Sequence, residues 1–162
     1  MEVPFSKLPQ DSKIWTYTTS RELTDDEINK LRSYSSYFLE KWTSHGMEIE
    51  ASVLFPYNHF IIICAKQVNK SLSGCSIDDS IRFIKKIEDR FDLILLDRNI
   101  IAFKDGSRIK KIDLENFKKE IARGHINSNT IVFNTLINTK EEYETIWEVS
   151  ASKSWHSNFL KL

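Results

Sequence analysis

The pattern of hydrophobic and polar positions predicts strands and helices in turn along the first part of the chain. Residues 13–19 are rich in β-branched and aromatic side chains, which is typical of a strand. Thr24 and Glu27 have the spacing of a capping box, and apolar residues then recur at helical spacing up to Gly46, so a helix is predicted over 25–44. Its apolar face consists of Ile28, Leu31, Tyr34, Phe38 and Trp42.

The next segments complete a recognisable order of elements. Residues 50–55 and 60–66 flank a turn that contains proline, and together they predict a hairpin. Ser76 is expected to cap a helix over 77–91, and the apolar run at 93–97 predicts a fourth strand. The order βαββαβ is the split βαβ arrangement of ferredoxin-like domains, so strands one and three should be adjacent central strands, with both helices on one face.

The last third of the chain predicts additions to this core. The turn signal Asp105-Gly106 lies between residues 100–104 and 108–112 and predicts a second hairpin. A helix over 113–123, a strand over 131–137 and a helix over 139–147 follow.

We expect an α+β protein with one domain over residues 1–162. A ferredoxin-like core occupies about 13–97, and a hairpin-helix-strand-helix extension occupies about 98–162. Strand 60–66 is apolar on both of its faces, which predicts cover on both sides, and the extension is the expected second cover.

Composition limits the classes of function. The 162 residues are 41% hydrophobic, enough for a sizeable core, and 23 basic residues balance 23 acidic ones. A net charge of zero provides no long-range field that would recruit a polyanion. The N-terminal residues do not resemble a signal peptide, and the longest apolar runs are too short to span a bilayer, so we expect a cytoplasmic protein with no membrane association.

The common enzyme motifs do not occur. The four glycines, at positions 46, 74, 106 and 124, are too far apart for a phosphate-binding loop or a dinucleotide fingerprint, which argues against an ATPase and against a Rossmann dehydrogenase. No two of the four histidines have the spacing of a ligand pair, and the two cysteines, Cys64 and Cys75, are expected to be free thiols. We therefore expect no metal and no cofactor.

Four segments carry a resemblance to a known family: Gly74-Cys75-Ser76-Ile77-Asp78, residues 42–46, residues 129–134 and the pair Trp155-His156. On these segments the chain resembles a small family of uncharacterised Bacteroidota proteins that often carry the label "ABC transporter ATPase". The resemblance runs over almost the full length and implies a cytoplasmic bacterial protein, with no established reaction. The label is not supported here, because the chain has no Walker motif.

The start of the second helix is the candidate binding site, because free amides at a helix N-terminus can receive an anionic group. It comprises Gly74, Cys75, Ser76, Asp78 and Asp79. Cys75 is expected to pack as a small hydrophobic residue. The alternative is a thiol-dependent enzyme in which the helix dipole activates Cys75 as the nucleophile, although the two aspartates oppose a thiolate.

A basic group in the C-terminal third provides a third hypothesis, an RNA- or ribosome-associated factor. Its candidate polyanion contacts are Lys104, Arg108, Lys110, Lys111, Lys118 and Lys119. Strand 60–66 lacks the glycine and the repeated aromatics of an RNA-recognition motif, which disfavours nucleic acid. The leading interpretation is a non-catalytic module that binds a protein partner or a small ligand.

Overall fold

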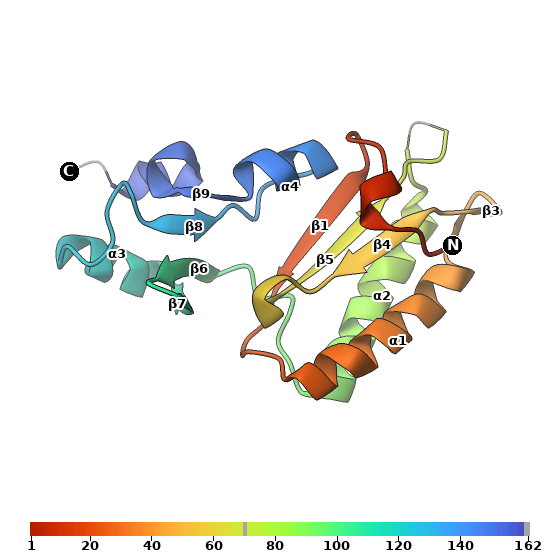
Figure 1. Ribbon diagram of the computed structural model, residues 1–162, viewed down its shortest axis with the longest axis horizontal. Helices are drawn as coiled ribbons and strands as arrows, with labels where there is room; N and C mark the ends of the chain where they lie inside the picture. Colours follow the sequence, from red (N-terminus) through yellow and green to blue (C-terminus); the bar gives the residue numbers. More distant parts are fainter. Residues whose placement is uncertain (70, 161–162) are drawn as a thin grey trace. The chain divides into compact units, whose positions relative to one another are not determined.

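The chain is a mixed α+β protein that forms two compact units. The computed structural model describes residues 1–69 and 71–160 (Figure 1). The first unit comprises residues 1–95 and 138–141, and the second comprises residues 96–137 and 142–162. Among the described residues, no helix is both long enough and apolar enough to cross a membrane. The expectation of a single domain stays a prediction.

The first unit is built on a three-stranded antiparallel sheet. Its strands are β1 (Lys13–Thr18), β4 (Ala51–Leu54) and β5 (Phe60–Ala65), in the order β1-β5-β4. Tyr17 lies opposite Ile61 in the pairing of β1 with β5. The predicted adjacency of strands 13–19 and 60–66 is therefore confirmed, but the prediction that both are central is wrong, because β1 lies at the edge of this sheet.

Two long helices cover one face of this sheet. Figure 1 shows α1 (Asp25–Lys41) and α2 (Gly74–Phe91) on the same side of the strands. Their inner residues form one core with the strand residues that point toward them, as predicted. This core contains Ile28, Leu31, Leu39, Phe83, Ile84, Ile87, Tyr17, Ile61 and Ile63. All six residues of β5 are buried, so its opposite face is covered as well.

Helix α1 is shorter than predicted. It ends at Lys41, and Trp42 follows as an extended C-cap residue. A small hairpin of β2 (Thr43–Ser44) and β3 (Met47–Glu48) comes next. Its turn residues have φ of 52° at position 45 and 74° at position 46, which is the left-handed backbone that two-residue hairpin turns require.

Helix α2 begins earlier than predicted, and its cap is Ser73 rather than Ser76. The Ser73 hydroxyl oxygen accepts a hydrogen bond from the Ser76 amide at 3.1 Å. Gly74, Cys75 and Ser76 consequently belong to the first helical turn. Ser76 is buried there, and its own hydroxyl donates back to the Ser73 carbonyl at 2.7 Å.

The strand predicted over 93–97 does not form. Asp92 ends α2 in the left-handed conformation, with φ of 52°. Glu88 then accepts hydrogen bonds from the amides of Leu93 and Leu95, through its carbonyl and its carboxylate respectively. These bonds hold the apolar run in an irregular course, and Leu93 and Leu95 are still buried in the core.

A distant segment lies beside the start of β1 instead. The Ile14 amide donates to the Asn138 carbonyl at 2.9 Å, and the Lys140 amide donates to the Ser12 carbonyl at 3.0 Å. Just beyond the far end of β1, the Ser20 amide donates to the Ile94 carbonyl at 3.1 Å, and the Ile94 amide donates to the Ser20 hydroxyl at 2.9 Å.

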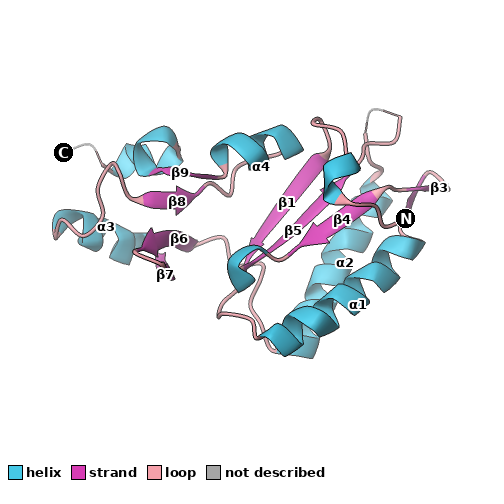
Figure 2. Cartoon of the chain, viewed as in Figure 1, coloured by secondary structure: helices cyan, strands magenta, loops and turns pink. Residues whose placement is uncertain are grey.

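The second unit contains a four-stranded antiparallel sheet (Figure 2). The strands are β6 (Ile100–Asp105), β7 (Arg108–Asp113), β8 (Ile131–Phe133) and β9 (Glu148–Ser150), in the order β7-β6-β8-β9. The predicted hairpin is confirmed as β6 and β7. Strand β8 is shorter than predicted, because Asn134 begins a turn in which its side-chain oxygen accepts from the Leu136 amide.

Helices complete this unit. Helix α3 (Leu114–Ala122) begins at the predicted cap, where the Asp113 carboxylate accepts from the Asn116 amide at 2.8 Å. Helix α4 (Lys140–Ile146) occupies most of the helix predicted over 139–147. The described part of the chain also contains four short 3-10 helices, of which η1 (Phe5–Lys7) and η2 (Pro56–Asn58) belong to the first unit, and η3 (Ala151–Lys153) and η4 (Trp155–Phe159) to the second.

Candidate functional site

The structure separates the residues of the predicted site at the start of α2. The Cys75 side chain is exposed, so the expectation that it packs as a small hydrophobic residue is wrong. Ser76 is buried, and its carbonyl accepts a hydrogen bond from the indole N–H of Trp42 at 2.8 Å. Gly74 and Asp78 are exposed. Helix α2 starts earlier than predicted, which turns Cys75 toward solvent and Ser76 toward the core.

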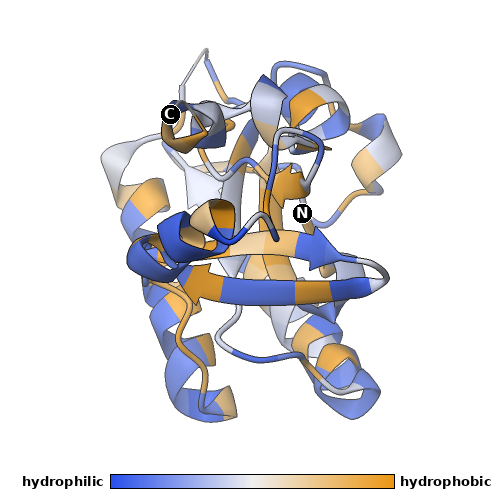
Figure 3. Cartoon of the chain, turned by 90° about the vertical axis from the view of Figure 1, so that its left-hand side faces the viewer, coloured by the Kyte–Doolittle hydropathy of each residue, from blue (hydrophilic) through white to orange (hydrophobic). Residues whose placement is uncertain are grey.

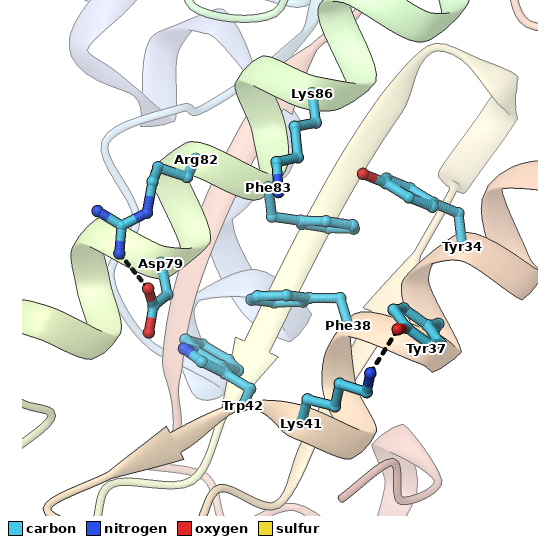
Figure 4. Close-up of a pocket in the computed structure, with 9 residues that line it drawn as sticks. All are labelled: Tyr34, Tyr37, Phe38, Lys41, Trp42, Asp79, Arg82, Phe83 and Lys86. Carbon is cyan, nitrogen blue, oxygen red and sulfur yellow. Dashed lines mark hydrogen bonds and ion pairs between the residues drawn. The ribbon is translucent and has the colours of Figure 1, made fainter.

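Asp79 is the member of the predicted set that reaches a cavity. Its carboxylate pairs with the Arg82 guanidinium one turn along α2. Both side chains line a cavity of about 260 Å³ between α1 and α2 (Figure 4).

Aromatic rings form the floor of this cavity. The rings of Phe38 and Phe83 stack almost parallel, with centroids 4.2 Å apart and an interplanar angle of 5°. Tyr34 stacks on Phe83 at 5.4 Å, and Trp42 lies 5.2 Å from Phe38. Positions 34, 38 and 42 follow one another at intervals of four residues, which places them on the flank of α1 that faces α2. The ring faces are largely used in contacts with one another.

A second hollow continues the first along the same pair of helices. It measures about 520 Å³ and shares Tyr34 and Tyr37 with the first. We call the combined surface the α1–α2 groove. From the first helix it is lined by Asn29, Lys30, Ser33, Tyr34, Tyr37, Phe38 and Lys41 of α1 and by the C-cap residue Trp42, and from the second by Asp79, Arg82, Phe83, Lys86, Arg90 and Phe91 of α2.

The groove carries an excess of positive charge. Among the residues that the structure describes, five cationic side chains and one carboxylate line it. The cations are Lys30, Lys41, Arg82, Lys86 and Arg90, and the carboxylate is Asp79. Lys30 is also paired with Asp26, at 2.9 Å, on the exposed side of α1.

Tyr37 is the most exposed ring of the groove, with 62% of its surface accessible. The Lys41 ammonium donates a hydrogen bond to its phenolic oxygen and lies 4.0 Å from the ring centroid (Figure 4). This hydrogen bond from Lys41 lowers the pKa of the Tyr37 phenol below its ordinary value. The Arg90 guanidinium is placed in a similar way, 5.3 Å from the centroid of the Tyr34 ring.

The predicted polyanion contacts lie in the second unit, where several of them have partners. Lys104 pairs with Glu148 at 2.9 Å, Lys110 with Asp105 at 2.7 Å, and Lys119 with Glu115 at 3.3 Å. The Lys118 ammonium lies 5.2 Å from the centroid of the Phe159 ring.

Strand β7 contains two further residues of the predicted basic group. Figure 3 shows hydrophilic and hydrophobic residues interspersed along β7, the strand that contains Arg108 and Lys111. The ion pairs of Lys104, Lys110 and Lys119 neutralise part of the predicted basic group.

No group of three or more histidine, cysteine, aspartate or glutamate side chains in residues 1–69 and 71–160 could hold a metal ion. The groove lining consists mainly of rings, ammonium and guanidinium groups, with Asn29 and Ser33 beside them. Its one carboxylate is already paired with Arg82. The chemistry that this surface offers is therefore the binding of an anion with an apolar part.

Most groove residues were missed from the sequence, although two signals could have found them. Arg82, Lys86 and Arg90 recur at intervals of four and form one cationic row on α2. Tyr37 widens the aromatic stripe of α1 beyond the width that contact with a sheet requires.

Comparison of the chain with protein-family models, with curated proteins and with solved structures gives no match. The chemistry of the groove is therefore the basis for a functional proposal.

Proposed function

We propose that this protein is a non-catalytic binding module, that the α1–α2 groove is its recognition surface, and that its ligand joins an anionic group to an apolar one. The observation that carries the proposal is the concentration of five cations against one carboxylate around an aromatic floor. The chain as a whole has no net charge, so this excess is local. A concave surface with an apolar floor and a few placed polar groups is the usual form of a binding site.

The contacts within the groove support binding rather than turnover. Lys41 and Arg90 are held over tyrosine rings, which fixes their charges at the edge of the apolar floor. Pre-positioned charges lose little conformational entropy when a ligand binds. Lys86, on α2, is exposed and can meet an anion directly.

The proposal is tested with anilinonaphthalenesulfonate, a fluorescent probe that joins aromatic rings to a sulfonate. Titration of the folded protein should give saturable fluorescence, and Lys86→Glu should weaken binding of the probe by about tenfold, because it replaces an attraction with a repulsion. The matched control is Lys85→Glu, an exposed change of the same kind on the same helix at a position that does not line the groove. This control should change the affinity by less than about twofold.

Equal affinity of the two variants for the probe, or no saturable binding by the wild type, would contradict the proposal. Circular dichroism and thermal unfolding of both variants establish that each is folded. Binding should also weaken as salt is added, since exposed charges are screened.

A thiol-dependent enzyme that uses Cys75 stays the alternative proposal. Its support is the position of Cys75 in the first turn of an 18-residue helix, together with the exposure of its side chain. Cys75 does not line the α1–α2 groove, so the two proposals concern different surfaces.

We also propose that the first unit is a ferredoxin-like domain that has lost its fourth strand. The order β1-β5-β4 and the two helices on one face support this relation. Residues 138–140 then occupy part of the place beside β1 that a fourth strand would take. We likewise propose a cytoplasmic location and membership of the Bacteroidota family, and the sequence resemblance supports both.

A further inference from the structure

We infer that the ligand of the α1–α2 groove is an acidic, amphipathic α-helix of a partner protein, which lies lengthwise between α1 and α2. This inference rests on the proposed function, because it identifies the class of partner for the same surface. Three features of the groove support a helix over an extended peptide, a nucleic acid or a small molecule.

The first feature is a cationic ladder on α2, formed by Arg82, Lys86 and Arg90. These residues are four positions apart, so successive cations rise by about 6 Å along the helix and the ladder spans about 12 Å. All three line the groove. A second helix alongside α2 that carries Asp or Glu at every fourth position would place one carboxylate opposite each cation. A small molecule would engage one or two of these three cations, whereas a helix can engage the whole row.

The second feature is the absence of backbone partners in the walls. The groove walls are helices, in which backbone N–H and C=O groups are already bonded within each helix. An extended peptide laid on the aromatic floor would bury backbone groups without hydrogen bonds, which is costly. A helix satisfies its own backbone and presents only side chains, as in other complexes where an amphipathic helix binds a groove.

The third feature is the way the rings stack. Nucleic-acid bases bind aromatic residues through open ring faces. Phe38 and Phe83 are stacked face to face at 4.2 Å, Tyr34 lies against Phe83, and Lys41 lies over the Tyr37 ring. The rings of Tyr34, Phe38 and Phe83 therefore offer mainly their edges to a ligand, and edges suit leucine or phenylalanine side chains of a packed helix.

The test is a selection from a displayed library of random 18-residue peptides against the full-length protein. A parallel selection uses the Lys86→Glu variant, and Lys85→Glu is the matched control. Peptides enriched on the wild type and on Lys85→Glu, but not on Lys86→Glu, depend on the groove. We expect these peptides to carry acidic residues at intervals of three or four and apolar residues at i, i+3, i+4 and i+7, on the opposite flank of the same helix.

Synthetic copies of the enriched peptides provide a direct measurement. Their circular dichroism should gain helical signal on binding, and a proline in the middle of the peptide should weaken binding by at least about tenfold, because proline breaks a helix. Tyr37→Ala should weaken binding of the same peptides, whereas Tyr37→Phe, which keeps the ring, should bind within about threefold of the wild type.

The outcomes separate the inference from the proposed function. Acidic peptides that depend on Lys86 but lack helical spacing, or that tolerate proline, would overturn the helical partner and leave the binding module intact. Enrichment that ignores Lys86 would overturn both. Sedimentation of the protein alone covers a further case: a dimer that Lys86→Glu dissociates would show that a second copy of the chain occupies the groove, and would also overturn the inference.

Discussion

At the scale of single residues, the clearest agreement between sequence and structure is the cap of α1. The Thr24 hydroxyl oxygen accepts a hydrogen bond from the Glu27 amide at 3.1 Å, and the Glu27 carboxylate accepts from the Thr24 amide at 3.0 Å. The Arg21 guanidinium makes a bidentate ion pair with the same carboxylate, and both N–O distances are 2.8 Å. The hydrogen bonds from Arg21, and then those from Thr24, lower the pKa of Glu27 to about 2.

Thr24→Ala should therefore lower the free energy of unfolding by about 1 kcal/mol, because it leaves an N-terminal amide of the helix without its partner. Equilibrium urea unfolding at pH 7 measures the change. Thr24→Ser keeps the hydroxyl and should stay close to the wild type. An alanine variant as stable as the wild type would show that the cap contributes nothing.

Cys75 offers a second test at this scale. Because its side chain is exposed, Cys75→Ser should change the free energy of unfolding by less than about 0.5 kcal/mol and should leave binding in the groove unchanged. In the folded protein iodoacetamide should label Cys75 and spare the buried Cys64. Rapid labelling of Cys75 at pH 6, well below the usual thiol pKa of about 8.5, would instead favour the thiol-dependent enzyme.

At the scale of elements, the sequence predicts the helices and hairpins whose formation depends on neighbouring residues. The two long helices and the β4–β5 and β6–β7 hairpins follow from periodicity and turn residues, and the pairing of β1 with β5 follows from the order of the elements. The prediction of a strand over 93–97 is wrong because a hydrophobic run can be buried without forming a strand. Glu88 binds its amides, and the place beside the start of β1 is taken by residues 138–140, more than forty positions further along. No local pattern contains that information.

Lys140 is the residue that fixes this distant segment. It is buried with only 3% of its surface accessible, and its ammonium donates to the carbonyls of Phe5 at 3.0 Å and Leu8 at 2.8 Å. Lys140→Ala should lower the free energy of unfolding by about 2 kcal/mol, because two partly buried carbonyls lose a charged donor. Urea unfolding measures this loss, and Lys7→Ala, an exposed lysine of the same unit, should have almost no effect. Equal effects of the two changes would contradict the assigned role.

At the scale of the whole molecule, the candidate site was mostly hidden from sequence reasoning because it depends on two helices meeting. Net charge sums over the chain and gives zero, whereas the structure gathers five cations on one groove. Of the residues proposed from sequence, Asp79 reaches that groove. The periodicity of each helix predicted its core-facing residues, but the flank of α1 that faces α2 is defined only by their packing.

The stability of the molecule should also depend on pH through His156. This side chain is fully buried, its Nδ1 atom contacts the Ser154 hydroxyl, and its ring stacks on Trp155 with centroids 3.8 Å apart. Burial lowers the pKa of His156 from 6.5 to about 4 in the folded protein. Between pH 6.5 and pH 4 the unfolded chain therefore binds more protons than the folded one, so stability falls as the solution becomes more acidic.

The wild type should lose about 1–2 kcal/mol of unfolding free energy between pH 7 and pH 5 from this group. Urea unfolding at the two pH values measures the loss, and the informative quantity is the difference between them for each variant. His156→Asn removes the titrating group and should reduce that difference, even though it also lowers stability at both pH values by disturbing the core. His45→Asn is the matched control, since His45 is exposed in a turn where asparagine is well tolerated, and it should keep the pH dependence of the wild type. If His156→Asn keeps the same pH dependence as His45→Asn, another group is responsible for the loss of stability in acid.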